Sequence, residues 1–100
     1  MSDKIHLSVD ASLKELLPGF LASRRADLEA MRRALRSGDL AAIRRVGHNI
    51  RAFSRLYGFE DLTALGEELQ QAAAERSMLR IAHVQSRLAD YLGRIEFTDG

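Results

Sequence analysis

The sequence predicts an all-α protein, an antiparallel four-helix bundle with a short extra helix at its N-terminus. Apolar residues recur at helical spacing in four successive segments, and only short links separate these segments. Pro18–Gly19, Ser37–Gly38 and Gly58 fall at the links. Residues 5–9 are the sole candidate for a strand, and a single strand would have no partner.

The N-terminal third of the chain contains a short helix followed by a long one. Ser12 and Glu15 have the spacing of a capping box, which predicts a helix start at Ser12. Pro18–Gly19 ends this short helix or turns the chain. The first long helix begins near Phe20 and stops at Ser37–Gly38. Its expected inward stripe comprises Leu21, the stem of Arg24, Leu28, Met31 and Leu35.

The second long helix is predicted from about Leu40 to Tyr57. Asp39 is a favourable N-cap residue, and Gly58 stops the helix. The apolar side of this helix, which we interpret as buried, consists of Ile43, Val46, Ile50, Phe53 and Tyr57.

The third and fourth helices complete the bundle. The third opens at Glu60 or Asp61, and Ser77 caps the fourth. Their expected inward residues are Leu62, Leu65, Leu69 and Ala72 or Ala73 in the third, and Ile81, Val84, Leu88, Tyr91 or Leu92, and Ile95 in the fourth. Gly47 and Gly66 lie inside helices at a cost of about 1 kcal/mol each, for which a close helix contact is the usual reason.

Size and composition favour one intracellular domain. The 100 residues suit a single domain with a core over about residues 10–96 and loose ends at residues 1–9 and 97–100. The sequence contains no cysteine, which excludes disulfides and thiolate chemistry. No apolar run reaches the roughly 20 residues of a membrane span, and the first residues do not resemble a signal peptide. We therefore expect a cytoplasmic protein that does not bind membranes.

The charge is unevenly distributed although the net charge is only +1. Residues 20–57 contain nine arginines against three acidic residues, whereas residues 59–76 contain five acidic residues against one arginine. The basic half would attract an anionic partner or a phosphate group. The alternative is that most of these arginines are solvated side chains on exposed helix faces.

His48 is the candidate for chemistry. At about 100° per residue, the apolar positions of the second helix lie more than about 130° from His48, so the histidine faces away from the core. Arg44, Arg51 and Arg55 lie within about 60° of it on one side. Ala41 and Ala52 lie within about 40° on the other side, with Arg45 beyond them. The simpler alternative is an exposed histidine without a role.

This arrangement suits phosphoryl transfer. A neutral imidazole can attack phosphorus through a ring nitrogen. Arginines beside the ring can then stabilise the phosphoryl group through charge-assisted hydrogen bonds. Small residues at positions 41 and 52 leave room for a bulky partner, and Gly47 gives further clearance beside the histidine.

The segment from Gly47 to Ser54, followed by Tyr57–Phe59, resembles the active helix of histidine-containing phosphotransfer (Hpt) domains. The resemblance extends over roughly residues 10–95. The matching positions are His48 for the phospho-accepting histidine, Ile50 for the apolar residue, Arg51 for the basic residue and Gly58 for the glycine that ends the helix.

Three positions depart from the pattern of that family. Ala52 stands where a glycine is typical, and its methyl group tightens the approach to the histidine slightly. Phe53 replaces a small residue, and we interpret it as part of the core. Arg51 replaces a lysine, so that a planar guanidinium takes the place of a compact ammonium group.

The resemblance implies a phosphocarrier, not an ATP-using enzyme, because Hpt domains exchange a phosphoryl group with an aspartate on a response-regulator receiver domain. Its expected partners are receiver domains or a hybrid sensor kinase. The receiver supplies the magnesium ion, and the chain itself needs no cofactor or metal. We expect a monomer, because one exposed basic face suggests docking to a partner.

Two other functions stay open from the sequence. A degenerate Hpt-like module would bind a receiver domain on the same surface without accepting phosphate. A nucleic-acid-binding helical domain would use the arginines, but the small net charge and few aromatic residues argue against it.

Overall fold

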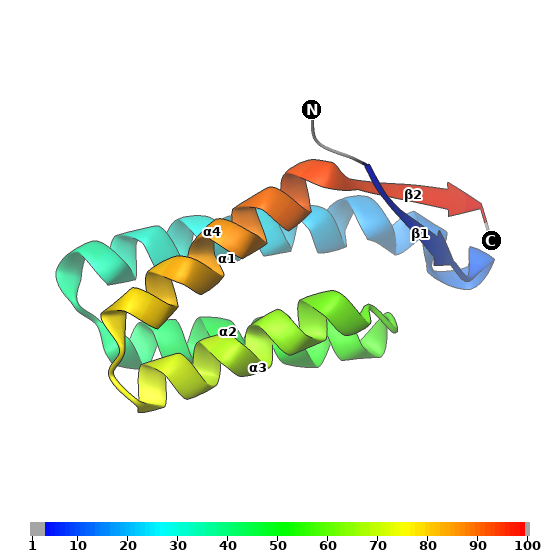
Figure 1. Cartoon of the computed structure of the whole chain (residues 1–100). Coiled ribbons are helices and arrows are strands. Elements are labelled where there is room, and N and C mark those ends of the chain that lie inside the picture. The colour runs from blue at the N-terminus through cyan, green and yellow to red at the C-terminus, as the bar shows by residue number, and fades with distance from the viewer. Residues whose placement is uncertain (1–3, 100) are drawn as a thin grey trace.

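The chain folds into four long helices that run alternately up and down (Figure 1). The computed structural model describes residues 4–99, with side chains at residue 4 and residues 10–95. The helices are α1 (Leu17–Ser37), α2 (Leu40–Leu56), α3 (Glu60–Ala74) and α4 (Met78–Arg94). The predicted four-helix bundle is thus confirmed. Within the described residues, no helix is both long and apolar enough to cross a lipid bilayer.

Two of the predicted caps are present. The Asp39 carboxylate accepts a hydrogen bond from the Ala42 amide at 3.0 Å and so begins α2. The Ser77 hydroxyl accepts one from the Arg80 amide at 3.3 Å at the start of α4. The three links between helices are short, which forces neighbouring helices to be antiparallel.

The extra N-terminal helix exists, but it differs from the prediction. It is a 3-10 helix, η1 (Ala11–Leu16), and its cap is Asp10, whose carboxylate accepts from the Ser12 amide at 2.9 Å. The predicted cap at Ser12 is therefore wrong. Pro18 does not end this helix, because it lies in the first turn of α1, where its missing amide proton is not needed.

The two ends of the chain form a parallel pair of strands, β1 (Ile5–Val9) and β2 (Ile95–Asp99). Ile5 is paired with Ile95 and Val9 with Asp99. The interpretation of residues 5–9 as a strand without a partner, and of both ends as loose, is wrong over these segments. The partner strand was missed because it continues directly from α4 (Figure 1). Residues 1–3 and 100 lie outside the described residues.

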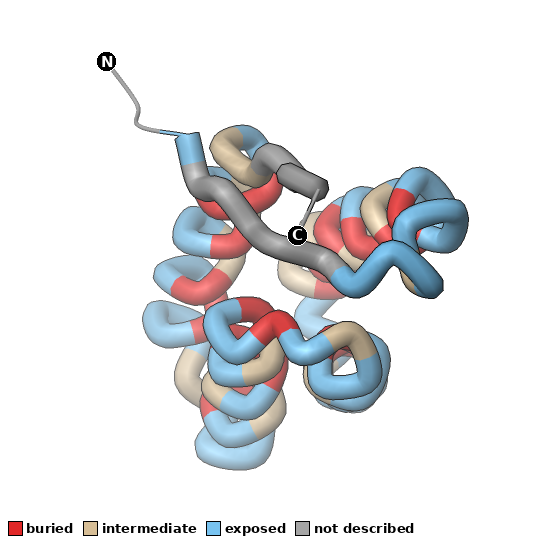
Figure 2. The backbone as a smooth tube through the Cα atoms, turned by 90° about the vertical axis from the view of Figure 1, so that its right-hand side faces the viewer, coloured by how far each residue is buried: buried red, intermediate tan, exposed pale blue. Residues whose placement is uncertain are grey.

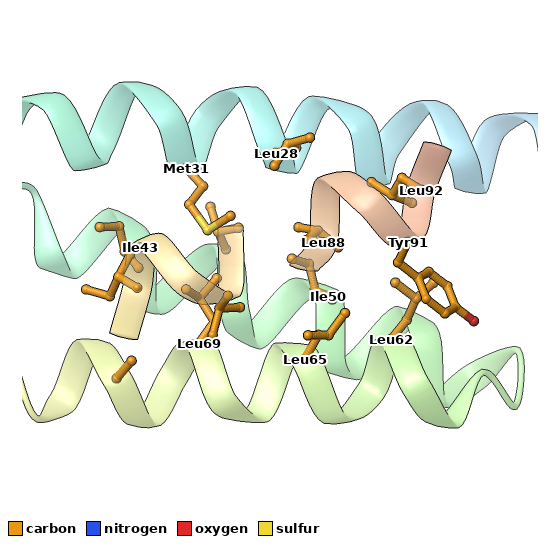
Figure 3. Packing of buried hydrophobic residues seen from close by; sticks show 14 of the residues in the cluster. Leu28, Met31, Ile43, Ile50, Leu62, Leu65, Leu69, Leu88, Tyr91 and Leu92 are labelled. Carbon is orange, nitrogen blue, oxygen red and sulfur yellow. The ribbon is translucent and has the colours of Figure 1, made fainter. Parts of the chain in front are cut away.

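The core lies between the four helices. Seen from the end that carries the chain termini, the buried parts of the helices face the middle of the bundle (Figure 2). Leucine, isoleucine and methionine side chains interdigitate there (Figure 3), each contributing about 2 kcal/mol through burial. The fully buried apolar side chains include Met31, Ile43, Ile50, Leu62, Leu69, Ile81 and Leu88.

The buried face of α2 differs from the predicted one at Phe53. This side chain is 49% exposed, whereas Ser54 is completely buried. The reason is that α2 makes its most extensive contact with α3, on the side of the helix that carries Gly47 and Ser54. That contact turns the buried face away from Phe53, and the interpretation of Phe53 as a core residue is wrong.

Ser54 gives a test of the interior of the bundle. Its buried hydroxyl has no hydrogen-bond partner within the described residues. We expect Ser54→Ala to stabilise the fold by about 1 kcal/mol, because a desolvated hydroxyl is removed and alanine favours the helix. Urea unfolding measures this as a higher midpoint at unchanged slope. Ser86→Ala, at an exposed position of α4, is the control for helix propensity alone, and a destabilised Ser54→Ala variant would contradict the prediction.

Candidate functional site

His48 lies on the exposed face of α2. Ile43, Val46 and Ile50, on the opposite side of the helix, are buried in the core. Their burial fixes the rotation of α2 and presents the imidazole to solvent. The structure therefore agrees with the orientation that the helical spacing predicts.

A very close crossing of α2 and α3 lies at Gly47, next to His48 in the chain. A methyl group added at Gly66 would come 2.5 Å from the Arg51 amide nitrogen and 2.8 Å from the Gly47 carbonyl oxygen. One added at Gly47 would come 2.9 Å from both the amide nitrogen and Cγ of Gln70. Only glycine fits at either position, which confirms the expected close contact. The crossing places Gln70 of α3 beside Gly47, the residue before His48 on α2.

His48 borders an open groove of about 760 Å³ between α2, α3 and the link that follows α3. The lining contains three arginines, two side-chain amides and small apolar residues, and it contains no acidic residue. The lining residues are Leu40, Ala41, Arg44, Arg45, His48 and Asn49 from α2, and Gln70, Ala73, Ala74 and Arg76 from α3 and its C-terminal link. The arginines therefore give the groove a positive charge that no acidic lining residue offsets.

The structure brings only some of the predicted residues together with His48. Arg44 and Ala41 line its groove. Arg51 is half-buried, and its Nε atom is buried without a hydrogen-bond partner within the described residues. Ala52 is exposed and lies one helical turn after His48, outside the groove lining.

Arg55 and Gly58 do not belong to the groove. The Arg55 guanidinium lies 3.5 Å from the Glu67 carboxylate, and both residues border a separate depression with Gly58. Gly58 has a φ of 77°, a left-handed conformation that ends α2. Arg55 is therefore paired with an acid of α3, and Gly58 terminates the helix.

Four polar residues of the groove lining had no role assigned from the sequence: Arg45, Asn49, Gln70 and Arg76. Arg45 and Asn49 lie on α2 itself, and the helical spacing placed Arg45 at the margin of the site. Gln70 follows Gly66 by one helical turn. A predicted contact between Gly47 and Gly66 would therefore have placed Gln70 near His48. Arg76 comes from the α3–α4 link, which helical spacing does not position.

An apolar flank lies on the C-terminal side of His48. Phe53 is 49% exposed and Leu56 is 73% exposed. The Arg24 guanidinium lies 5.2 Å from the centre of the Phe53 ring and 2.8 Å from the Asp27 carboxylate. Burial raises the pKa of the Asp27 carboxyl, and the Arg24 charge opposes this rise. Through the contact between Arg24 and Phe53, this flank brings α1 next to α2.

The arrangement is suited to a phosphoryl group on an exposed nitrogen nucleophile. The imidazole is open to a second macromolecule, and cationic side chains are present on its own side of the bundle. The described chain offers no cluster of three histidine, aspartate or glutamate side chains that could hold a metal ion. A partner that brings its own phosphate could approach His48 directly.

Comparison with known proteins gives one match. A family model described as Hpt domain matches residues 15–96, which is most of the chain and includes all four helices and the groove. No curated protein and no solved structure matches the chain. The resemblance drawn from the histidine segment is confirmed.

Proposed function

Because the chain belongs to the Hpt domain family, whose members are phosphocarrier modules of two-component signalling, we propose that it carries a phosphoryl group on His48 between receiver domains. The observation that carries this proposal is the position of His48, exposed at the edge of a groove whose charged lining residues are all arginines. Such a surface attracts a phosphorylated partner and leaves the histidine accessible to it.

The proposed reaction is a reversible exchange between two side chains. A neutral nitrogen of His48 attacks the phosphorus of an aspartyl phosphate on the receiver, and a P–N bond forms as the P–O bond to the aspartate breaks. The aspartate leaves as a carboxylate, and the reverse reaction passes the phosphoryl group to a second receiver. Magnesium is expected on the receiver, and the chain itself takes no cofactor.

Three arginines differ in their proposed roles. Arg44 and Arg51 lie one helical turn before and after His48, which suits them to stabilise the phosphoryl oxygens by charge-assisted hydrogen bonds. Arg44 also lines the groove beside His48, whereas the Nε atom of Arg51 is buried without a hydrogen-bond partner within the described residues. Arg55 would first have to leave Glu67, so we assign it the smallest contribution.

The proposal places the protein in the cytoplasm as a monomer that docks to receiver domains or to a hybrid sensor kinase. The test is phosphoryl transfer from a panel of phosphorylated receiver domains, read by intact mass. We expect one added phosphate that is labile in acid and stable in base. If a receiver binds but transfers nothing, the chain is a docking module without phosphate chemistry. If none binds or transfers, the proposed function is wrong.

Ala52 provides a further prediction about the approach to His48. It is exposed and lies one turn after the histidine on the same side of α2. We expect Ala52→Trp to slow transfer from a receiver at least about tenfold, because the indole fills the space that the partner must enter. Transfer rates and melting temperatures of the variant and the wild type measure the effect.

The matched control is Ala82→Trp, at an exposed position of α4. Both substitutions carry a similar helix-propensity cost of about 0.5 kcal/mol, so that their melting temperatures should agree. Equal transfer rates for the two variants would show that the surface around Ala52 is not the approach to the histidine.

A further inference from the structure

The groove beside His48 has two arginines that the proposed phosphoryl chemistry does not use. Arg45 comes from α2 and Arg76 from the link between α3 and α4, and both are exposed. Both line the groove, which lies toward the end of the bundle where α2 begins and α3 ends (Figure 1). We call Arg45 and Arg76 the arginine pair.

No carboxylate within the described residues forms an ion pair with either member of the arginine pair. The acidic residue next to Arg76 in the chain, Glu75, is already engaged by the Arg80 guanidinium and by the Gln71 amide at 3.2 Å. Other arginines of the bundle, such as Arg55 and Arg87, are paired with acids of α3. The positive charge of the arginine pair therefore remains available to an external anion.

The backbone of Arg76 adds an independent observation. Its φ of 58° is in the left-handed region, and it is the only described residue other than glycine with a positive φ. The corresponding positions after α1 and α2 are Gly38 and Gly58, with φ of 72° and 77°. Glycine adopts this conformation freely, whereas a residue with a Cβ is disfavoured. An arginine at such a position points to a function of its side chain.

The groove is also larger than the phosphoryl group requires. Its volume of about 760 Å³ is in the range that accommodates a whole ligand or several side chains of a partner. Toward the C-terminal end of α2, Leu56 presents apolar surface, whereas the exposed Phe53 lies on the side of α2 that faces α1. The surface around His48 is thus cationic toward the start of α2 and carries an exposed leucine near the end of the helix.

We propose that the arginine pair binds carboxylates on the receiver domain that docks over His48, and that this contact fixes the orientation of the receiver. This inference rests on the proposed function. Charge complementarity selects an acidic segment of the receiver for the cationic end, and Leu56 offers an apolar contact near the end of α2. A receiver held at the arginine pair in this way has its phosphorylated aspartate over the histidine.

The test uses Arg45→Ala and Arg76→Gly in the full chain, with Arg33→Ala as control. Arg33 is exposed on α1 and lies outside the groove lining. Its replacement removes one positive charge, as each groove substitution does. Arg76→Gly is chosen because glycine suits the left-handed position, so that the melting temperature should not fall. Four quantities are measured: Kd for the unphosphorylated receiver, kcat and KM for transfer from the phosphorylated receiver, and the rate of His48 phosphorylation by phosphoramidate.

We expect each groove variant to raise Kd and KM about tenfold at low salt, with kcat and the phosphoramidate rate changed less than about twofold. The difference from wild type should shrink at about 0.5 M salt, because exposed charges are then screened. Arg33→Ala should leave all four quantities within about twofold of wild type.

Three outcomes would overturn the inference. Unchanged Kd in both groove variants would show that the arginine pair does not contact the receiver. A phosphoramidate rate that falls in parallel with receiver transfer would show that the arginines act on the phosphoryl group itself. A loss of affinity for a double-stranded DNA probe, with receiver binding unchanged, would assign the arginine pair to nucleic acid.

Failure of the proposed function gives a different pattern. If wild type takes phosphate from neither phosphoramidate nor a receiver, but binds a receiver through Arg45 and Arg76, the phosphocarrier role is wrong and the docking inference stands. If no receiver binds, both are overturned.

Discussion

Substitution of His48 by glutamine is expected to abolish phosphoryl uptake, with a loss of at least about a thousandfold. Glutamine retains a polar side chain of similar reach but has no nitrogen that can form a stable bond to phosphorus. Because His48 is exposed, its replacement should leave the melting temperature unchanged and receiver binding mostly intact. Intact mass after incubation with a phosphorylated receiver measures the uptake.

The chain contains its own control for this substitution. His83 is also exposed on a helix, but it lies on α4 with Leu79 and Ser86. His83→Gln should accept phosphate at the wild-type rate. If His48→Gln still takes up phosphate and His83→Gln does not, the phospho-accepting residue is His83 on α4. That result would contradict the proposed role of His48.

Substitution of Gly66 by alanine is expected to cause the largest loss of stability, about 3 kcal/mol. The added methyl group would lie 2.5 Å from the Arg51 amide nitrogen, and backbone atoms cannot turn aside as a flexible side chain can. The two helices would have to separate, although alanine by itself favours a helix by about 1 kcal/mol. The loss is a large fraction of the 5–15 kcal/mol of a typical domain.

Gly93→Ala is the matched control, since Gly93 also lies within a helix, in the last turn of α4, and the added methyl group would meet no other part of the described chain within 4 Å. It should gain at most about 1 kcal/mol from helix propensity alone. Urea unfolding of both variants gives the two free energies. A Gly66→Ala variant as stable as Gly93→Ala would show that α2 and α3 do not cross as closely as described.

Local patterns account for most of the predicted fold. The spacing of apolar residues predicts which face of each helix is buried, and caps such as Asp39 and Ser77 predict where two helices begin. The error at Phe53 has a physical reason, because the buried face of α2 depends on which neighbour packs most closely. The pairing of β1 with β2 joins opposite ends of the chain, which no local pattern reports.

The candidate site is predictable to the extent that it lies on one helix. The exposure of His48 and the position of Arg44 beside it follow from helical spacing along α2. Gln70 and Arg76 come from α3 and its C-terminal link, so that only the packing of helices brings them to the groove. Arg55 has the correct spacing, but Glu67 on the neighbouring helix changes its role.

The strand pair at the two ends of the chain has a consequence for the order of folding. Antiparallel helices joined by short links make contacts between residues that are close in the sequence, and such contacts form fast. The ladder that begins with Ile5 and Ile95 instead closes a loop that contains the whole bundle. The entropic cost of closing this loop is smallest once α1 and α4 already lie together. We therefore expect the strands to form last and to open first. Hydrogen exchange at their amides should be faster than at those of the helices, without global unfolding.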